Sequence, residues 1–216
     1  MAEAITPRWS NYLFRRGDDF EFWKEYLTDN ERNVLFIIGL GFDPRMCQGL
    51  KAISRIGGLG KRDCVVIQFD EGAGSSSVAY SKLIEENIRH LQNLFPFGKK
   101  SFRTIAMWSD DNRRIGSRNA ANIFASLEDF SGYTDIVVDV SAMPRGLYFP
   151  LIGKVLYLVD SSGISGTLSK APNLHVLVSE NAQLDSKIND EGIDDEASYM
   201  YGFTGALDTE SASGSP

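Results

Sequence analysis

The chain has 216 residues, 43% hydrophobic and 24% charged, which is enough for one sizeable core and short for two domains. No run approaches the eighteen apolar residues of a membrane span, and the first residues lack the basic and apolar segments of a signal peptide. We therefore expect a cytoplasmic protein with no membrane partner. Cys47 and Cys64 are expected to be buried free thiols, and the absence of clustered cysteine and histidine predicts no metal site.

The net charge of −7 is unevenly distributed. Residues 180–216 hold nine acidic residues and one lysine, a charge of −8, which leaves +1 for residues 1–179. A nearly neutral body does not favour direct binding of nucleic acid, which needs a basic face. We expect residues 1–200 to form a single domain and residues 201–216 to be a disordered tail.

Five short apolar runs, rich in Val, Ile and Phe, read as strands that are covered on both faces. They lie at 33–39, 64–69, 102–108, 135–140 and 174–178. Helical patterns separate them at 44–56, 76–95, 111–130 and 144–159, and an amphipathic segment at 18–27 precedes the first run. Pro150 predicts a kink in the last of these helices or a late start. The alternation predicts an α/β fold with an open, mainly parallel Rossmann-like sheet of about five strands and helices on both faces.

Ligands of such sheets bind outside the carboxyl ends of the strands, where helix N-termini favour anions. The loop after the first run reads GLGFDPRM. Gly39 and Gly41 permit a tight turn and a close backbone approach, while Asp43 can cap the next helix. Arg45 would then stand in a first helical turn, where a cation is unfavourable unless an anion is present. Phosphate or carboxylate binding and a capped turn with a solvated arginine are both open here.

Polar residues also follow the second and third runs. Asp70 and the neighbouring Glu71 can accept ribose hydroxyls or can be solvated loop carboxylates. Trp108 can stack on a base, although packing is the commoner role of a tryptophan at a strand end. Neither His90 nor His175 has an acid and a nucleophile nearby in the sequence, so both are expected to be structural.

The loop after the fourth run, in DIVVDVSAMPRGLYFP, carries the most information. Asp139 ends a buried strand, where an unpaired charge would be costly, and Arg145 is the expected partner. Ser141 is expected to cap the following helix. Because Arg45 and Arg145 each open a helix at the same edge of the sheet, a shared anionic ligand would account for both. Pairing of each arginine with Asp70, Asp139 or Glu180 in a structural network is the alternative.

The segment VVDVSAMPRGLYFPLIG resembles the hallmark loop of the CRISPR-associated Rossmann-fold (CARF) sensor domains. In that family a strand ends in Asp-x-Ser/Thr-Gly-Gly-Thr-Lys, and the loop receives a cyclic-nucleotide phosphate. The resemblance implies ligand-contacting roles for Asp139, Ser141 and Arg145, and matches GLGFDPR to the family's other ligand loop. Ala142-Met143-Pro144 replaces the family's Gly-Gly-Thr.

The resemblance implies a regulatory or sensor domain that binds a nucleotide or another anionic small molecule. Such a domain would work within a larger assembly, with a protein partner or as a homo-oligomer, in prokaryotic antiviral defence. The residues also leave open a Rossmann-fold enzyme, either an S-adenosylmethionine-dependent methyltransferase or a nucleotide- or NAD-processing hydrolase. The sequence identifies no cofactor and no catalytic residue. The candidate ligand-binding residues are Gly39, Gly41, Asp43, Arg45, Asp70, Asp139, Ser141 and Arg145.

Overall fold

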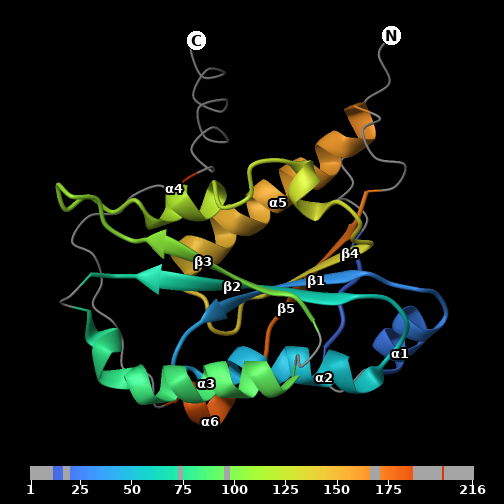
Figure 1. The fold of residues 1–216 in the computed structure, drawn as a ribbon, viewed down its shortest axis with the longest axis horizontal. Helices are drawn as coiled ribbons and strands as arrows, with labels where there is room; N and C mark the ends of the chain where they lie inside the picture. Colours follow the sequence, from blue (N-terminus) through green and yellow to red (C-terminus); the bar gives the residue numbers. More distant parts are fainter. Residues whose placement is uncertain are drawn as a thin grey trace, which may run out of the picture.

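The computed structural model describes residues 12–16, 20–72, 75–94, 98–165, 171–186 and 201. Its centre is a five-stranded sheet in the order β3-β2-β1-β4-β5 (Figure 1). Every neighbouring pair of strands is parallel. The strands are β1 (Val34–Leu40), β2 (Arg62–Asp70), β3 (Lys100–Ala106), β4 (Asp135–Asp139) and β5 (Asn173–Leu177). This confirms the predicted open α/β sheet. Of the predicted tail, only Tyr201 is among the described residues.

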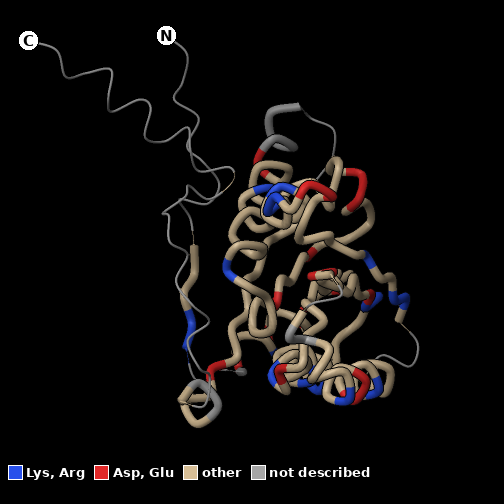
Figure 2. The backbone as a smooth tube through the Cα atoms, turned by 90° about the vertical axis from the view of Figure 1, so that its left-hand side faces the viewer, with Lys and Arg blue, Asp and Glu red and all other residues tan. Residues whose placement is uncertain are grey.

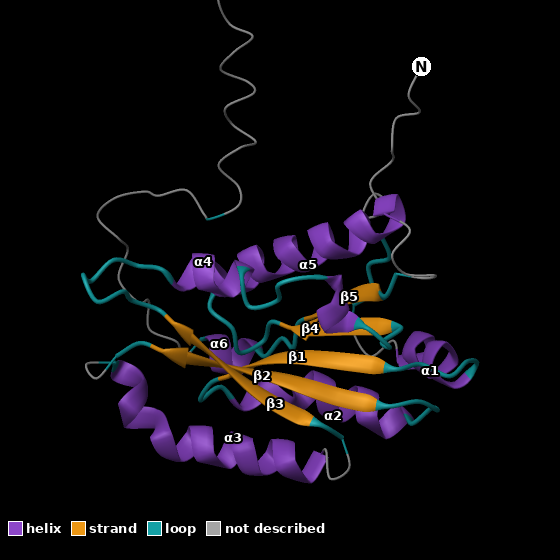
Figure 3. Cartoon of the chain, turned by 45° about the horizontal axis from the view of Figure 1, so that its top comes forward, coloured by secondary structure: helices purple, strands orange, loops and turns teal. Residues whose placement is uncertain are grey.

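Helices cover both faces of the sheet (Figure 3). One face carries α1 (Phe20–Thr28), α2 (Gln48–Ile56) and α3 (Ser81–Leu94). The other carries α4 (Gly116–Ala121) and α5 (Arg145–Ser165), and α6 (Ala182–Asp185) follows β5. Three short 3₁₀ helices complete the described elements: η2 (Pro44–Cys47), η3 (Ser76–Tyr80) and η4 (Leu127–Phe130).

Two apolar clusters lie on opposite sides of the central strand β1. Leu35 and Ile37 pack toward α4 and α5, whereas Phe36 and Ile38 pack toward α1, α2 and α3. All four side chains are buried. Successive side chains of a strand point to opposite faces, so a strand covered on both faces must be apolar throughout. This is why the strands appear in the sequence as nearly continuous apolar runs.

The predicted helix at 111–130 is wrong in extent. Regular α-helix is confined to α4, and the chain then turns into η4. Local side-chain bonds compete with the helix after α4, where the Asp129 carboxylate accepts from the backbone N–H groups of Ala125 and Ser126. Asn, Asp and Ser form such bonds at the expense of helix interiors.

The late helix start suggested by Pro150 is also wrong, because α5 begins at Arg145 and continues through that proline. Cys47 and Cys64 are buried free thiols, as predicted, and burial raises the pKa of both, that of Cys47 to about 11. Among the described residues, no helix combines the length and the apolar character needed to cross a bilayer.

Candidate functional site

The strand order reverses between β1 and β4. The chain runs outward from β1 to β2 and β3, then returns to β4 on the other side of β1 and continues to β5. The helices after β1 and β4 therefore leave toward opposite faces of the sheet. A reversal of this kind opens a crevice at the carboxyl ends of the strands, where ligands of open α/β sheets bind. The loops after β1 and β4 meet there.

The loop after β1 is held by its own side chains. Asp43 caps η2 by accepting a hydrogen bond from the backbone N–H of Arg45 at 2.8 Å, as predicted for a cap. The Arg45 guanidinium donates to both oxygens of the same carboxylate, with Nη2 2.6 Å from Oδ2. Asn87, a buried residue of α3, donates to the carbonyls of Gly41 and Asp43. Since Arg45 is only 9% exposed, its charge is balanced inside the protein by Asp43.

The two glycines of this loop face the loop that follows β4. A Cβ atom on Gly39 would lie 2.6 Å from Met143 Cγ and 2.9 Å from the carbonyl oxygen of Ala142. A Cβ atom on Gly41 would lie 3.4 Å from that same oxygen, which is an ordinary contact. The space that a glycine-rich turn usually leaves for a ligand is therefore filled beside Gly39 by the protein's own chain.

Asp139 at the end of β4 is bonded to Ser141 and not to Arg145, so the predicted ion pair is wrong. Its Oδ1 accepts from both the backbone N–H and the hydroxyl of Ser141. The Ser141 oxygen accepts in turn from the backbone N–H of Ser179, at 2.8 Å. The prediction that Ser141 caps α5 is therefore wrong. Ser141 instead connects the loops after β4 and β5. Arg145 is exposed at the start of α5.

The second carboxylate oxygen of Asp139 is buried and has no hydrogen-bond partner among the described residues. It lies against Gly49 of α2, where a Cβ atom would approach to 2.7 Å. Burial raises the pKa of Asp139 to about 6, the hydrogen bonds from Ser141 oppose that rise, and the charge of Asp43 adds to it. Because burial is the largest influence, a proton on Asp139 relieves the cost of a buried charge.

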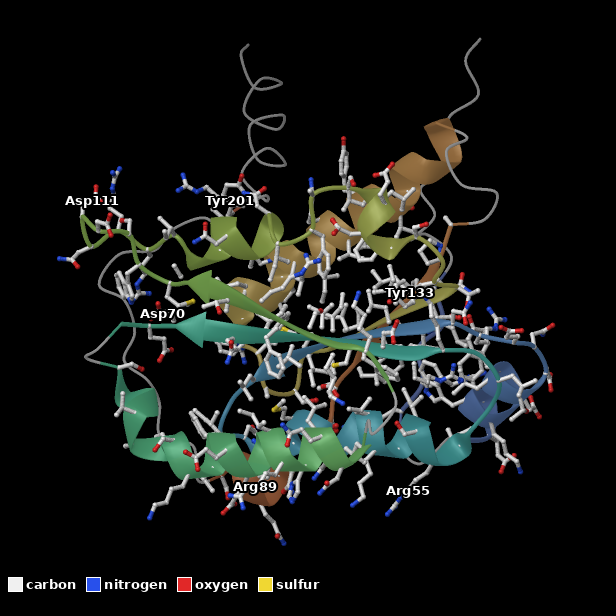
Figure 4. The ribbon with its side chains drawn as sticks, viewed as in Figure 1. Arg55, Asp70, Arg89, Asp111, Tyr133 and Tyr201 are labelled. Carbon is white, nitrogen blue, oxygen red and sulfur yellow. The ribbon has the colours of Figure 1, made fainter. Side chains whose placement is uncertain are left out.

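Asp70 ends β2 and is exposed (Figure 4). Its Oδ1 accepts from the backbone N–H of Gly72, at 3.0 Å, and Gly72 has a φ of +83°. Asp70 thus stabilises the turn that leaves the strand, a role common for aspartate. The adjacent Glu71 accepts from the hydroxyl of Ser75.

An open pocket of about 540 Å³ lies beside the filled crevice, where the loops after β2 and β3 face the first turns of α4 and α5. Its volume is within the range of small-molecule sites. The start of α5 contributes Pro144 and Gly146, and a Cβ atom on Gly146 would lie 3.6 Å from Ser117 Oγ of α4, so the two helices begin side by side. The main polar and aromatic side chains of the wall are Glu71, Ser75, Trp108, Arg114 and Ser117.

Trp108 and Arg114 form one side of the pocket. They are joined by an isolated antiparallel bridge, and the guanidinium carbon of Arg114 lies 5.1 Å from the centroid of the Trp108 ring. The indole remains 43% exposed. An exposed aromatic face beside a guanidinium can stack on a planar group and attract an anion.

Of the eight candidate residues, none lines this pocket, although Arg145 lies between two that do. The structure gathers Gly39, Gly41, Asp139 and Ser141 at the filled crevice. The sequence had indicated Glu71 and Trp108 as possible ligand contacts but not Ser117, which lay inside the helix predicted at 111–130. The signal that could have found it is the Gly116-Ser117 pair, which interrupts the apolar pattern.

A second polar cluster lies at the opposite, amino end of the sheet. The buried Asp135 of β4 accepts from Tyr26 and Thr134 and is bonded to His175 Nε2 at 2.9 Å. Burial acts to raise the pKa of Asp135, but the hydrogen bonds from His175, Thr134 and Tyr26 prevail, and the net pKa is lower than usual. Such a satisfied cluster agrees with the structural role expected of His175.

Within the described residues, no group of three or more histidine, cysteine or acidic side chains could hold a metal ion. A comparison with models of protein families finds none that matches the chain. A comparison with curated proteins finds no significant match.

Proposed function

We propose that the chain is a regulatory or sensor domain that binds a nucleotide, or another small molecule bearing a phosphate, in the pocket at the carboxyl edge of the sheet. The observation that carries this proposal is the meeting of the start of α5 with Trp108 and Arg114 around one 540 Å³ pocket. Pockets at this edge are the usual ligand sites of Rossmann-like sheets.

Each part of a nucleotide has a counterpart in the wall. The long helix α5 begins with the N–H groups of Arg145 and Gly146, and the first N–H groups of a helix bear partial positive charge, so they attract phosphate. Arg114 in the wall adds positive charge, and so does the exposed Arg145, which stands between two lining residues. The Trp108 ring offers a stacking surface for a base, and the Glu71 carboxylate can accept hydrogen bonds from ribose hydroxyls.

The resemblance to CARF domains supports a regulatory role. The loop that carries the resemblance, DVSAMPRG, ends in Pro144 and Gly146, and both residues line the pocket. In CARF domains the corresponding loop receives the phosphate. A domain that binds such a ligand without transforming it would pass the signal to a protein partner or to another copy, within an assembly of the kind that acts in antiviral defence.

A thermal-shift experiment on the full chain tests the proposal. The panel contains linear and cyclic nucleotides, inorganic phosphate, NAD and S-adenosylmethionine. A ligand at a hundred times its dissociation constant adds about 2.7 kcal/mol to the free energy of unfolding, which raises the melting temperature measurably. Trp108→Ala and Arg145→Ala should reduce the shift produced by a nucleotide. Arg55→Ala is the matched control, since Arg55 is exposed on α2, on the other face of the sheet (Figure 4).

The pattern of responses separates the candidates. A nucleotide shift that is lost in Trp108→Ala and Arg145→Ala but kept in Arg55→Ala supports the proposed site. A shift with inorganic phosphate alone would show that the base contributes nothing and would remove the role assigned to Trp108. A shift with S-adenosylmethionine alone would favour the methyltransferase instead. If no compound raises the melting temperature, the proposal is wrong.

A further inference from the structure

The two edges of the sheet differ in how they are protected. The edge strand β3 carries Lys100 and Arg103, and Arg103 folds back to the carbonyl of Ile123 and to Asp129. The other edge strand, β5, reads NLHVL and carries no acidic residue, lysine, arginine or proline. Natural edge strands are usually shielded by charge, proline or a covering segment, because their free N–H and C=O groups pair readily with another strand.

A short segment, residues 12–16, lies outside the β5 edge and is called the arm below. In Figure 2 it forms the separate stretch of tube beside the body of the protein. Three consecutive apolar side chains of the arm are largely exposed: Tyr12 at 84%, Leu13 at 57% and Phe14 at 74%. Arg16 donates to Glu180, at 3.2 Å, which ties the arm to the loop after β5. Among the described residues, no strand pairing joins the arm to β5.

A cavity of about 560 Å³ separates the arm from β5. The arm forms one side, and the edge of β5 forms the other, including the exposed Val176. Helix α1 contributes Trp23 from one face of the sheet, and α5 contributes Leu156 from the other. The cavity is thus a slot with largely apolar walls, and among the described residues no further strand pairs with the β5 edge that it follows. An apolar chain in extended conformation is the occupant that would satisfy both the walls and the edge.

We propose that this slot receives the arm of a second copy of the same chain. Each arm already lies outside its own β5, with room between the two, and its apolar side chains stay largely exposed although they line the slot. A twofold axis between the two arms then places each arm in the other copy's slot, next to the other copy's β5. The interface is self-complementary, as a twofold dimer requires, and exchange of a terminal segment is a known low-cost route to such dimers.

The exchange joins two five-stranded sheets through a pair of arms and covers both β5 edges. Its surface shares no lining residue with the carboxyl-edge pocket. The proposal therefore stands independently of the proposed function, and failure of either one leaves the other intact.

The test is the molar mass of the full-length chain by light scattering coupled to size-exclusion chromatography, over a wide range of protein concentration. Leu13→Asp alters the arm and Val176→Lys alters the edge; both side chains are exposed, so both variants should fold. Val78→Lys is the matched control, because Val78 is an exposed valine of η3 that does not line the slot. Circular dichroism confirms folding of each variant.

Arm exchange predicts a dimer for the wild-type chain and for Val78→Lys, and a shift to monomer for both Leu13→Asp and Val176→Lys. A monomeric wild-type chain overturns the proposal. A dimer that survives Leu13→Asp but not Val176→Lys also overturns it, because direct pairing of two β5 edges would then be the contact.

Discussion

The guanidinium of Arg45 donates to both carboxylate oxygens of Asp43, two residues before it in the chain. Asp43 also caps η2 through the backbone N–H of Arg45, so one carboxylate stabilises the turn and balances the nearest cation. A cation in a first helical turn is unfavourable by itself, and here the required anion is a neighbouring side chain. A bound ligand is not needed to explain Arg45.

Replacing Arg45 by alanine should lower the stability of the protein. The variant loses charge-assisted hydrogen bonds in a largely buried place, each worth about 1.5–3 kcal/mol, so a loss of about that size is expected. The free energy of unfolding in urea measures it. Arg55→Ala is again the control and should change stability by less than about 0.5 kcal/mol. If Arg45→Ala keeps the stability of the wild type but no longer binds a nucleotide, the structural role is wrong and Arg45 is a ligand-binding residue.

The two glycines after β1 should differ in their tolerance of alanine. On Gly39 the added Cβ atom would meet Met143 and the backbone of Ala142 at less than 3.0 Å, whereas on Gly41 it meets only ordinary contacts. Overpacking of this kind costs about 1–3 kcal/mol. Gly39→Ala should therefore unfold at lower urea concentration than the wild type, and Gly41→Ala should nearly match it. Equal losses in the two variants would show that the loop after β4 does not pack as described.

The fold could be predicted from the sequence because its strands are covered on both faces. Runs such as NVLFIIG and DIVVDV have no other stable place than the middle of a parallel sheet, and the structure contains β1 and β4 there. Helix bounds were less predictable where side chains compete for the backbone. Asp129 illustrates this, since it accepts hydrogen bonds from the backbone of Ala125 and Ser126 where the helix predicted at 111–130 would have continued.

The sequence placed the candidate residues at the carboxyl edge of the sheet, but it could not predict how their side chains are arranged there. Which carboxylate an arginine selects depends on side-chain conformation, so the sequence could not tell that Asp139 would bond to Ser141 while Arg145 stays exposed. Met143 fills the crevice because the loop after β4 packs against the loop after β1. The spacing of residues along the chain does not predict this packing. The pocket therefore lies beside the predicted position.

The polar cluster at the amino end of the sheet should contribute to stability through Tyr26. Its hydroxyl donates to the buried Asp135 at 2.5 Å and accepts from Asn173 at 2.6 Å. Tyr26→Phe keeps the ring but removes one hydrogen bond from Asp135 and one from Asn173. The free energy of unfolding is therefore expected to fall by about 1.5–3 kcal/mol. Tyr157→Phe is the matched control, because the Tyr157 side chain is exposed on α5. If both variants unfold at the same urea concentration as the wild type, water must replace the missing hydroxyl.

Asp139→Asn should change how stability depends on pH. Burial raises the pKa of Asp139 to about 6, from 3.8 for an unperturbed aspartate. Between these two values the folded state holds a proton that the unfolded state has released, so this group's contribution to stability is complete below about pH 4 and is lost as the pH rises through 6. At 1.36 kcal/mol per pKa unit, the loss is about 3 kcal/mol.

Asparagine at position 139 can still accept from Ser141 and carries no charge at any pH. The free energy of unfolding of the variant minus that of the wild type should therefore increase by about 3 kcal/mol between pH 4 and pH 7. The difference between the two proteins must be used, because Asp135, with its lowered pKa, makes the wild-type profile slope in the opposite direction at acid pH. Urea unfolding at several pH values measures both curves. Parallel curves would mean that Asp139 is ionised in the folded protein throughout this range, stabilised there by a group that binds its second oxygen.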